Sequence, residues 1–399
     1  MKKSYYQAYI GTNSVRGSQG IYSIRIDADS FETEIIAATQ AYNTGGVALD
    51  RTERFLYAVN EGMTFDGYAD GGVSAYRIER NGELTKLGGQ RSFGQRTCCV
   101  AVDEAGENVY ACNFYHGTWT AFPVAKNGKV LPARLVVEPP REAVWKALHC
   151  VAPVGRDYVG VISLAECALV IYRAGDGKRI TSFEFPDKPF PRYFETSGKY
   201  IYAMMQMPDD IYVFEDRLEE EGSVRLLQKI SVMEESFRGM AATSTLRATP
   251  DGRFLLAANR PSNSITVFER RKDGTLARRS IAALPGDGSR DFHISRDGKI
   301  VVAALQHSDE ICVLEIDYEN GVLVNGGKNV SIPSPAAVAV SGRMEGRKYD
   351  DRRAAFSTGR KNETIGSKGG NSRSDEPVCI LLWRRMWRED SHGAVDKER

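Results

Sequence analysis

Ten polar side chains occupy corresponding places in a pattern that repeats along most of this chain. Four of them stand at the starts of expected strands: Arg96, His149, Arg192 and Arg290. Six stand at the ends of the strands that follow: Asn13, Glu61, Asn113, Gln206, Arg260 and Gln306. Four of the ten are arginines, whose planar guanidinium groups favour bidentate binding of carboxylate or phosphate. A single arginine is more often a solvated or salt-bridged residue, so their convergence is what predicts an anionic ligand.

His149 is the candidate proton acceptor of this set. It lies in Trp145-Lys-Ala-Leu-His-Cys, at the mouth of an expected strand, where an imidazole can take a proton near neutral pH. A hydrogen-bonded rim histidine is the alternative interpretation.

Glu61 begins a Gly-rich loop, residues 61–72. There it either orients the histidine and binds substrate hydroxyls, or caps its own loop.

Motifs for metals and nucleotide cofactors are absent from the sequence. The five histidines and seven cysteines show no His-x-x-x-His or Cys-x-x-Cys spacing typical of zinc sites. Gly-x-Ser-x-Gly, Walker-type loops and dinucleotide fingerprints are missing too. We therefore expect a site without metal or organic cofactor, and cysteines that are buried free thiols.

Residues 250–268 show in its clearest form the repeat that positions these side chains. Asp251-Gly252 predicts a tight turn, residues 254–258 an apolar strand, residues 259–263 a polar loop and residues 265–268 a second strand. The outer residue of that second strand recurs at intervals of 42 to 54 residues, as Tyr22, Tyr76, Phe122, Tyr172, Phe214, Phe268 and Leu314. Seven units at this spacing are typical of four-stranded propeller blades.

Turn residues and chain ends complete the prediction of the fold. Six Gly-containing pairs, the first being Asn81-Gly82, suit hairpin turns between the third and fourth strands of a blade. The strand Tyr5 to Thr12 and the apolar run Pro335 to Val340 can pair and close the ring. We predict an all-β, seven-bladed β-propeller closed by N- and C-terminal strands. In each blade the start of the first strand and the end of the second share a face, which gathers the ten polar residues on one rim.

Composition bounds the domain organisation and the class of partner. The 53 Lys and Arg residues balance 52 Asp and Glu residues, so neither nucleic acid nor an anionic membrane is an expected partner. The N-terminus lacks an apolar signal-peptide core and no window predicts a membrane span, so we expect a cytoplasmic location. Residues 1–341 are predicted to form the propeller, and residues 342–399, rich in Arg, Lys, Gly, Ser and Asp, a poorly ordered appendage. The oligomeric state stays open.

Taken together, these motifs resemble the lactonase family of seven-bladed propellers. That family contains propeller-type 6-phosphogluconolactonases and fungal carboxy-cis,cis-muconate lactonising enzymes. The resemblance covers residues 5 to about 340 and rests on several segments, among them Tyr9-Ile-Gly-Thr, Tyr57-Ala-Val-Asn-Glu61, Cys112-Asn-Phe-Tyr-His-Gly117 and residues 250–260 and 289–298.

The resemblance implies a site formed by a histidine, two arginines and a glutamate on the channel rim. His149 is similar to the second histidine of the family's His-x-His motif, whose first histidine is replaced by Ala147 in this chain. Arg192 matches the arginine of the Gly-Pro-Arg-His motif, and Arg260 matches that of the Asn-Arg motif. The family glutamate is replaced by Gln206, which cannot act as a carboxylate base.

The implied function is hydrolysis of an anionic sugar lactone, as by a 6-phosphogluconolactonase in carbohydrate metabolism. His149, helped by Glu61, would activate water, while Arg192 and Arg260 hold the anionic group and the developing oxyanion. The expected substrate-binding residues are Arg290, Arg96, Asn113, Gln206 and Gln306. Two alternatives stay open: a carboxymuconate-type lactonising cycloisomerase, and a non-catalytic propeller that binds a small anion or a partner protein, which Gln206 favours.

Overall fold

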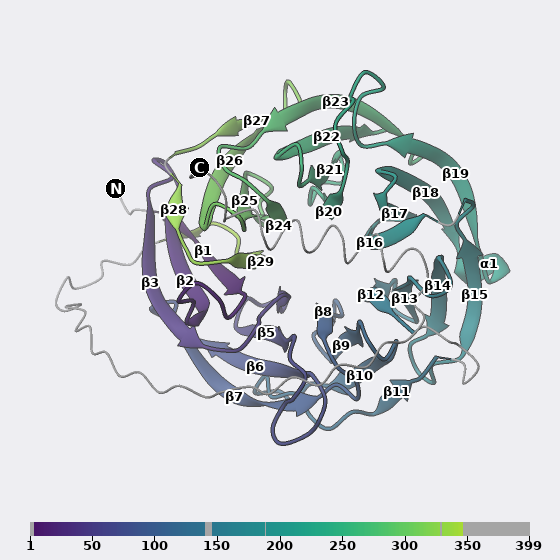
Figure 1. Cartoon of the computed structure of the whole chain (residues 1–399), viewed down its shortest axis with the longest axis horizontal. Helices are drawn as coiled ribbons and strands as arrows, with labels where there is room; N and C mark the ends of the chain where they lie inside the picture. Colours follow the sequence, from purple (N-terminus) through teal and green to yellow (C-terminus); the bar gives the residue numbers. More distant parts are fainter. Residues whose placement is uncertain (1–3, 140–145, 188, 328, 346–399) are drawn as a thin grey trace, which may run out of the picture. The chain divides into compact units, whose positions relative to one another are not determined.

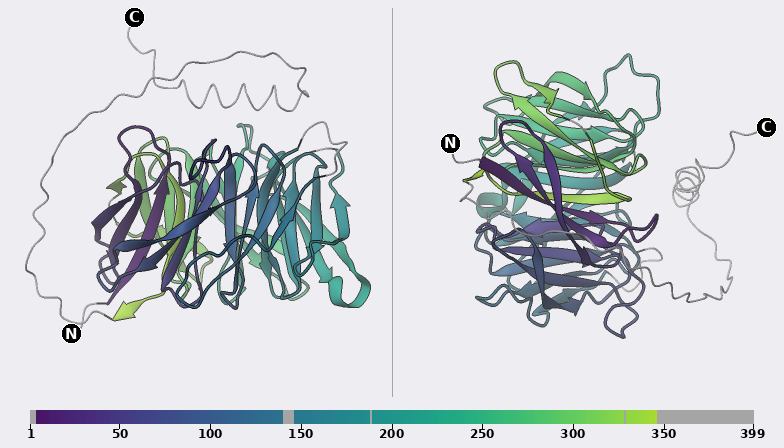
Figure 2. Two further views of the ribbon diagram at one scale, coloured as in Figure 1. Left: turned by 90° about the horizontal axis from the view of Figure 1, so that it is seen from below. Right: turned by 90° about the vertical axis from the view of Figure 1, so that its left-hand side faces the viewer.

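The computed structural model describes residues 4–139, 146–187, 189–327 and 329–345 of the chain. Their strands form seven antiparallel sheets that stand as blades around one axis (Figure 1). The side views show strands running between the two faces of this ring (Figure 2). The predicted all-β, seven-bladed propeller is confirmed.

Each blade has four main strands, which follow one another from the axis outward. Blade 1 is β29 (Pro335–Val340), β1 (Ser4–Thr12), β2 (Gly20–Asp27) and β3 (Thr33–Gln40). Blade 2 is β4 (Val47–Leu49), β5 (Phe55–Asn60), β6 (Gly72–Ile78) and β7 (Leu84–Arg91). Blade 3 is β8 (Thr97–Val102), β9 (Asn108–Asn113), β10 (Trp119–Pro123) and β11 (Leu135–Val137). Blade 4 is β12 (Leu148–Val154), β13 (Tyr158–Ser163), β14 (Ala168–Arg173) and β15 (Arg179–Glu184).

The remaining blades follow the same order. Blade 5 is β16 (Phe190–Ser197), β17 (Tyr200–Met207), β18 (Asp210–Arg217) and β19 (Ser223–Ser231). Blade 6 is β20 (Thr243–Ala248), β21 (Phe254–Asn259), β22 (Ser264–Arg270) and β23 (Leu276–Ala283). Blade 7 is β24 (Ser289–Ile294), β25 (Ile300–Leu305), β26 (Glu310–Asp317) and β27 (Val322–Asn325), with β28 (Val330–Ser331) as a further partner of β26.

Strands from the two ends of the propeller close the ring, as the sequence predicts. β1 pairs with β29 in the register Ala8 to Val340 and Ile10 to Val338, so one sheet holds residues more than 300 positions apart. Neighbouring innermost strands contact one another all the way round, which fixes the position of each blade. A ring without an open edge strand has no seam at which it can unravel.

The propeller extends beyond residue 341, where the sequence predicted its end. A two-residue strand, β30 (Met344–Glu345), pairs with Ser4 and Tyr5 of β1, so residues 342–345 belong to blade 1. A strand this short leaves no recognisable pattern in the sequence. The rest of the predicted appendage, residues 346–399, lies outside the described residues.

Apolar residues between adjacent blades form the core. Phe55 and Tyr57 of blade 2, for example, share one buried cluster with Val109 and Phe122 of blade 3. Alternate residues of a strand face opposite neighbours, so both sides of most sheets are buried. This packing makes each blade a rigid support for the loops at its ends.

Two of the predicted turns show why glycine is required there. Gly128 and Gly274 have φ angles of 83° and 85°, which disfavour any other residue. Each also packs directly on a ring of the preceding repeat: a Cβ atom would lie 2.1 Å from Phe55 at Gly128 and 2.3 Å from Tyr200 at Gly274. The turn residues thus act as inter-blade packing contacts as well.

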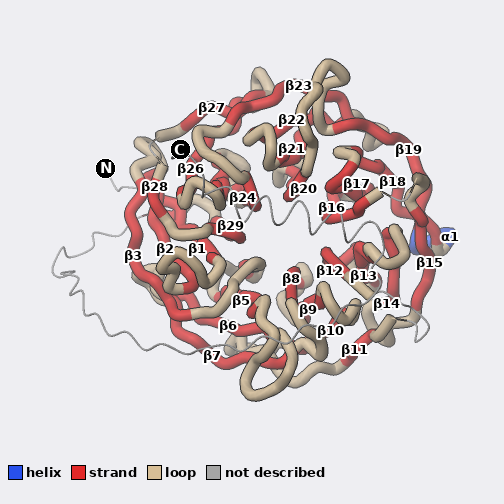
Figure 3. Tube along the Cα trace, viewed as in Figure 1, coloured by secondary structure: helices blue, strands red, loops and turns tan. Residues whose placement is uncertain are grey.

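Two other expectations need adjustment. A four-residue helix, α1 (Leu218–Glu221), interrupts the described strands where no helical periodicity exists, and it ends at Gly222 in the left-handed conformation (Figure 3). The six described cysteines are free, but Cys98, Cys99 and Cys167 are half-buried rather than buried. Among the residues placed, no helix is long and apolar enough to cross a membrane.

Substitution of Ala339 by aspartate tests the closing strand. Ala339 on β29 is 1% exposed and packs with Tyr9 and Tyr76. A buried, unpaired carboxylate there should lower the free energy of unfolding by about 3 kcal/mol or more, measured by urea denaturation. Ala283→Asp, at the exposed end of β23, serves as the control and should change stability by only about 0.5 kcal/mol. Equal denaturation midpoints for the two variants would contradict the closure.

Candidate functional site

The candidate site is built on an irregularity that recurs in the innermost strands. Near their starts, β8, β12, β16, β20 and β24 break register with the second strand of the same blade. The residue left unpaired is Cys98 in β8, His149 in β12, Arg192 in β16 and Arg290 in β24. Such bulges re-aim side chains and are frequent at active sites. Three of the predicted site residues therefore occupy equivalent positions in blades 4, 5 and 7.

Arg96 does not share this position, although the sequence predicted it as an equivalent of the other three. It precedes β8 in a loop, with a φ angle of 55°, and the bulged residue of blade 3 is Cys98. The position of a bulge cannot be read from a single sequence. The sequence prediction therefore chose Arg96, two residues before the bulged residue Cys98.

Arg192 is the centre of the cluster. Its side chain is buried, with only 7% of the residue exposed. Nη1 donates to Oε1 of Gln206 at 2.9 Å and lies 2.9 Å from Nε2 of His149, while Nε donates to the carbonyl oxygen of Ser244 at 2.9 Å. Gln206 is itself unpaired in its strand, opposite the bulge of β16. All three partners are neutral acceptors, so among the described residues no carboxylate hydrogen-bonds to this buried cation.

The electrostatic environment of Arg192 is strongly positive. Burial, followed by the charges of Arg260 and Arg290, lowers the pKa of Arg192 well below its ordinary value. The negative charge of Asp291 opposes this, but its carboxylate also lies 3.7 Å from Arg247. A guanidinium stays protonated in proteins, so the site keeps excess positive charge.

His149 is held as a neutral imidazole. An arginine nitrogen can only donate, so Nε2 of His149 accepts from Arg192 and the proton must reside on Nδ1. Burial, followed by the charge of Arg192, keeps the pKa of His149 well below its usual range, and Arg290 and Arg260 act in the same direction. Nδ1 has no hydrogen-bond partner among the described residues. The imidazole is thus neutral, as a base must be, but the lone pair on Nε2 is occupied by the hydrogen bond from Arg192.

Arg260 and Arg290 flank this pair. Arg260 follows β21, is half-buried, and its Nε donates to the carbonyl oxygen of Ala242 at 3.4 Å. Within the described part of the chain, the guanidinium of Arg290 forms no hydrogen bond or ion pair. The charges of both lower the pKa of His149 and of Arg192, so both lie near that pair. The cluster therefore contains five of the predicted residues: His149, Arg192, Gln206, Arg260 and Arg290.

Glu61 and Arg96 form a second, electrically neutral part of the rim. Nη2 of Arg96 donates to Oε1 of Glu61 at 2.6 Å, and both side chains are largely buried. The guanidinium also lies over the ring of Tyr115, 5.3 Å from its centroid. Tyr115 contacts Phe114, whose ring meets His149 edge-on at 6.1 Å between centroids. Aromatic contacts therefore connect the neutral pair to the cationic cluster.

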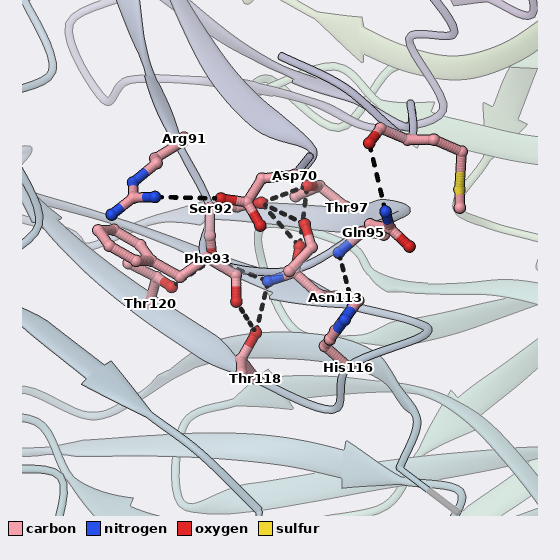
Figure 4. Close-up of polar contacts among 12 residues, drawn as sticks. Asp70, Arg91, Ser92, Phe93, Gln95, Thr97, Asn113, His116, Thr118 and Thr120 are labelled. Atoms are coloured by element: carbon pink, nitrogen blue, oxygen red, sulfur yellow. Dashed lines mark hydrogen bonds and ion pairs between the residues drawn. The ribbon is translucent and has the colours of Figure 1, made fainter. Parts of the chain in front are cut away.

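Asn113 is not available to a ligand, contrary to the sequence prediction. It is fully buried, and its amide nitrogen donates to the carbonyl oxygen of Ser92 and to the Thr118 hydroxyl at 2.8 and 2.6 Å. Its amide oxygen accepts from the hydroxyls of Ser92 and Thr97 at 2.8 and 2.9 Å (Figure 4). This closed network joins blades 2 and 3, so Asn113 has a structural role.

Gln306 and Asn13 are held mainly through their backbones. The carbonyl oxygen of Gln306 accepts from Arg16 at 2.6 Å, and the backbone nitrogen of Asn13 donates to Ser334 at 3.0 Å. Among the described residues, neither side chain hydrogen-bonds to Arg192 or His149. The structure thus leaves both on the strand ends where the sequence placed them, outside the cluster.

Sequence reasoning missed the Ser244 carbonyl, the aromatic pair Phe114 and Tyr115, and Cys98. A backbone carbonyl has no sequence signal. The aromatic pair could have been found, because it directly follows Asn113 at a strand end. No group of three or more His, Cys, Asp or Glu side chains suited to a metal ion occurs among the residues described.

Comparison with known proteins gives consistent matches over the propeller. Residues 7–340 match the model of a family described as lactonase, 7-bladed beta-propeller. A 6-phosphogluconolactonase of Bacillus subtilis (strain 168) is 31% identical over 346 residues, covering 84% of this chain and 97% of the relative. A 6-phosphogluconolactonase of Klebsiella pneumoniae (strain 342) is 27% identical over 290 residues, covering 67% and 82%.

Solved structures share the fold. The periplasmic gluconolactonase PpgL of Pseudomonas aeruginosa superposes with a TM-score of 0.76 at 21% identity, covering 84% of this chain and 99% of that one. A protein from Lactobacillus plantarum gives a TM-score of 0.74 at 24% identity, covering 85% and 99%.

The protonation state of His149 is open to a direct test. Nitrogen-15 spectra of the imidazole, assigned with a His149→Gln variant, should show a neutral ring with the proton on Nδ1 at pH 6, because the lowered pKa delays protonation to more acidic solution. Addition of phosphate should shift the ring toward protonation, since an anion offsets the surrounding arginines. A ring that is half-protonated near pH 6.5, or protonated on Nε2 when neutral, would contradict the geometry.

Proposed function

We propose that this chain, which belongs to the lactonase family of seven-bladed β-propellers, hydrolyses an anionic sugar lactone in the manner of a 6-phosphogluconolactonase. We place this activity in carbohydrate metabolism and, as the sequence predicts, in the cytoplasm. The family membership supports the reaction class, and the cationic cluster supports the charge of the substrate.

The observation that carries the proposal is the buried charge of Arg192. Its three hydrogen-bond partners are neutral, and Arg260 and Arg290 add further positive charge. A buried charge without a hydrogen-bonded counter-ion is costly, so an anionic group of the substrate would stabilise the site when it binds. Phosphate and carboxylate fit a guanidinium fork in a bidentate manner, which suits a phosphorylated or carboxylated lactone.

Substrate binding would also release the base. When an anionic oxygen accepts from Nη1 of Arg192, that nitrogen can turn away from Nε2 of His149, which then becomes free to accept a proton. The negative charge at the same time raises the pKa of His149 toward the neutral range. Binding thus converts a masked imidazole into a working base.

The reaction follows from this arrangement. A water molecule gives a proton to Nε2 of His149 and attacks the lactone carbonyl, and the negative charge that develops on the carbonyl oxygen is stabilised by Arg260 or Arg290. The ring C–O bond then breaks, the leaving alkoxide takes the proton back from His149, and the hydroxy acid leaves as a carboxylate after giving its acid proton to the solvent. Glu61 and Arg96 would bind sugar hydroxyls at the neutral part of the rim.

One observation favours a non-catalytic binder as the second candidate. Gln206 stands where a carboxylate could have steered Arg192 away from His149, and in its absence Nε2 of His149 is occupied. A propeller that only binds a small anion would need the arginines but no free base at His149. Thermal stabilisation by sugar phosphates without turnover would support the binder.

Kinetics on 6-phosphogluconolactone test the enzyme. Acid release followed by pH-stat should exceed the spontaneous rate for the wild-type chain, and His149→Ala and Arg260→Ala should each lower kcat/KM by about 100-fold, from loss of the base and of oxyanion stabilisation.

Arg80→Ala is the matched control, because Arg80 is exposed in the turn between β6 and β7. It should leave the rate unchanged. Equal rates for wild-type, His149→Ala and Arg260→Ala chains would remove the lactonase assignment for this substrate.

A further inference from the structure

Cys98 and Cys112 form a pair of thiols beside the candidate site. Cys98 is the bulged residue of β8, in the position that His149 and Arg192 occupy in the next two blades. Cys112 lies on the adjacent strand β9, and the two Sγ atoms are 3.9 Å apart. The pair is thus already in sulfur–sulfur contact within one blade.

Cys98 also reaches across to the strand that carries His149. Its thiol can donate to the carbonyl oxygens of Leu148 at 3.4 Å and of His149 at 3.7 Å. The negative charge of a Cys98 thiolate raises the pKa of Arg192, so the sulfur lies within electrostatic reach of the cluster. A chemical change at Cys98 would therefore affect both His149 and Arg192.

The two thiols differ in access. Cys98 is half-buried, whereas Cys112 is fully buried and burial raises the pKa of its thiol well above the ordinary value. A small oxidant meets Cys98 first, and Cys112 stands behind it as the second thiol.

We propose that Cys98 and Cys112 are a site of reversible oxidation by hydroperoxides. The Cys98 thiolate attacks the peroxide O–O bond, which yields a sulfenic acid on Cys98 and releases water after one proton transfer. The Cys112 sulfur then attacks the sulfenic sulfur, its thiol proton leaves with the hydroxyl group as a second water, and a disulfide forms. Two thiols are oxidised by two electrons while one hydrogen peroxide is reduced to two waters.

Disulfide formation alters the support of His149. The two sulfur atoms must close from 3.9 Å to about 2 Å, and Cys98 loses its S–H donor to the carbonyls of Leu148 and His149. The bulge that positions blade 3 against β12 is thereby pulled toward β9. Because a misplacement of about 1 Å can lower catalysis 100-fold, oxidation should inhibit the enzyme; this consequence, unlike the disulfide itself, rests on the proposed function.

Cys99 is the thiol that competes for this assignment. It pairs with Cys112 in the strand register and donates to the carbonyl oxygen of Val151 at 3.5 Å. Contacts with the Cys112 and Cys150 thiols lower the pKa of Cys99 well below its ordinary value. The experiment must therefore identify which sulfur atoms become linked.

Fragment mapping of the full chain after hydrogen peroxide treatment makes this identification. A protease that cuts after glutamate separates Cys98 and Cys99 from Cys112 at Glu104 and Glu107. Because Cys98 and Cys99 stay on one fragment, tandem mass spectrometry must then show which of the two carries the alkyl label and which is linked. After free thiols are alkylated, a fragment pair linked through Cys98 and Cys112 should appear and should vanish on reduction with dithiothreitol. The lactonase rate should fall about tenfold or more on oxidation and recover on reduction.

Two variants provide the controls. Cys98→Ser keeps a hydroxyl donor for the same carbonyls, and its rate should be the same before and after peroxide treatment. Cys312→Ala removes a buried thiol of blade 7, where burial raises the pKa of Cys312 to about 12, and it should remain as sensitive as the wild-type chain.

Two outcomes would overturn the proposal: a link that uses Cys99 in place of Cys98, or equal inactivation of Cys98→Ser and the wild-type chain. If the chain hydrolyses no lactone, the fragment map decides alone, because formation of the Cys98–Cys112 link needs no activity. In that case the link supports the oxidation site, and its absence overturns it.

Discussion

The buried guanidinium of Arg192 is the interaction on which the rest of the site depends. A cation removed from water needs acceptors, and within the described part of the chain Arg192 has three, all of them neutral. Two further arginines raise the positive potential around it, and the same field keeps His149 unprotonated. The protein therefore holds its base neutral and its anion-binding group ready with one arrangement of charge. The counter-charge that completes the arrangement is expected from the ligand.

Closure of the ring holds the mutually repelling arginines of this cluster in place. Each innermost strand is fixed between two neighbours, and the pairing of β1 with β29 leaves no seam through which repulsion could be relieved. Bulges at equivalent places then turn His149, Arg192 and Arg290 toward a common region. Next to them, Glu61 neutralises Arg96, so the rim has a cationic part for an acid group and a neutral part for hydroxyls. This division orients a substrate that carries both.

The sequence predicted the fold well, because the propeller period, the glycine turns and the closing strands are all local patterns. It also placed His149, Arg192, Gln206 and Arg260 on one rim, since strand ends determine the face. It failed where register or burial decides. The sequence pattern puts Arg96 in the position that Cys98 occupies, because a one-residue bulge leaves no trace in composition. Asn113 resembles the other strand-end amides, and only its contacts with Ser92 and Thr97 reveal that it is closed to ligands. The two-residue strand β30 is too short to form a pattern.

Calorimetry of 6-phosphogluconate, the expected product, binding to the wild-type chain and to Gln206→Glu measures whether the positive charge of Arg192 is reserved for the ligand. The substitution would place a carboxylate where Oε1 of Gln206 now accepts from Arg192 at 2.9 Å, so the protein would supply the counter-charge itself. Binding should be at least about tenfold weaker in Gln206→Glu, equivalent to about 1.4 kcal/mol, and unchanged in Gln40→Glu at the exposed end of β3. Equal affinity of Gln206→Glu and the wild-type chain would contradict the claim that the buried arginine is reserved for the ligand's anionic group.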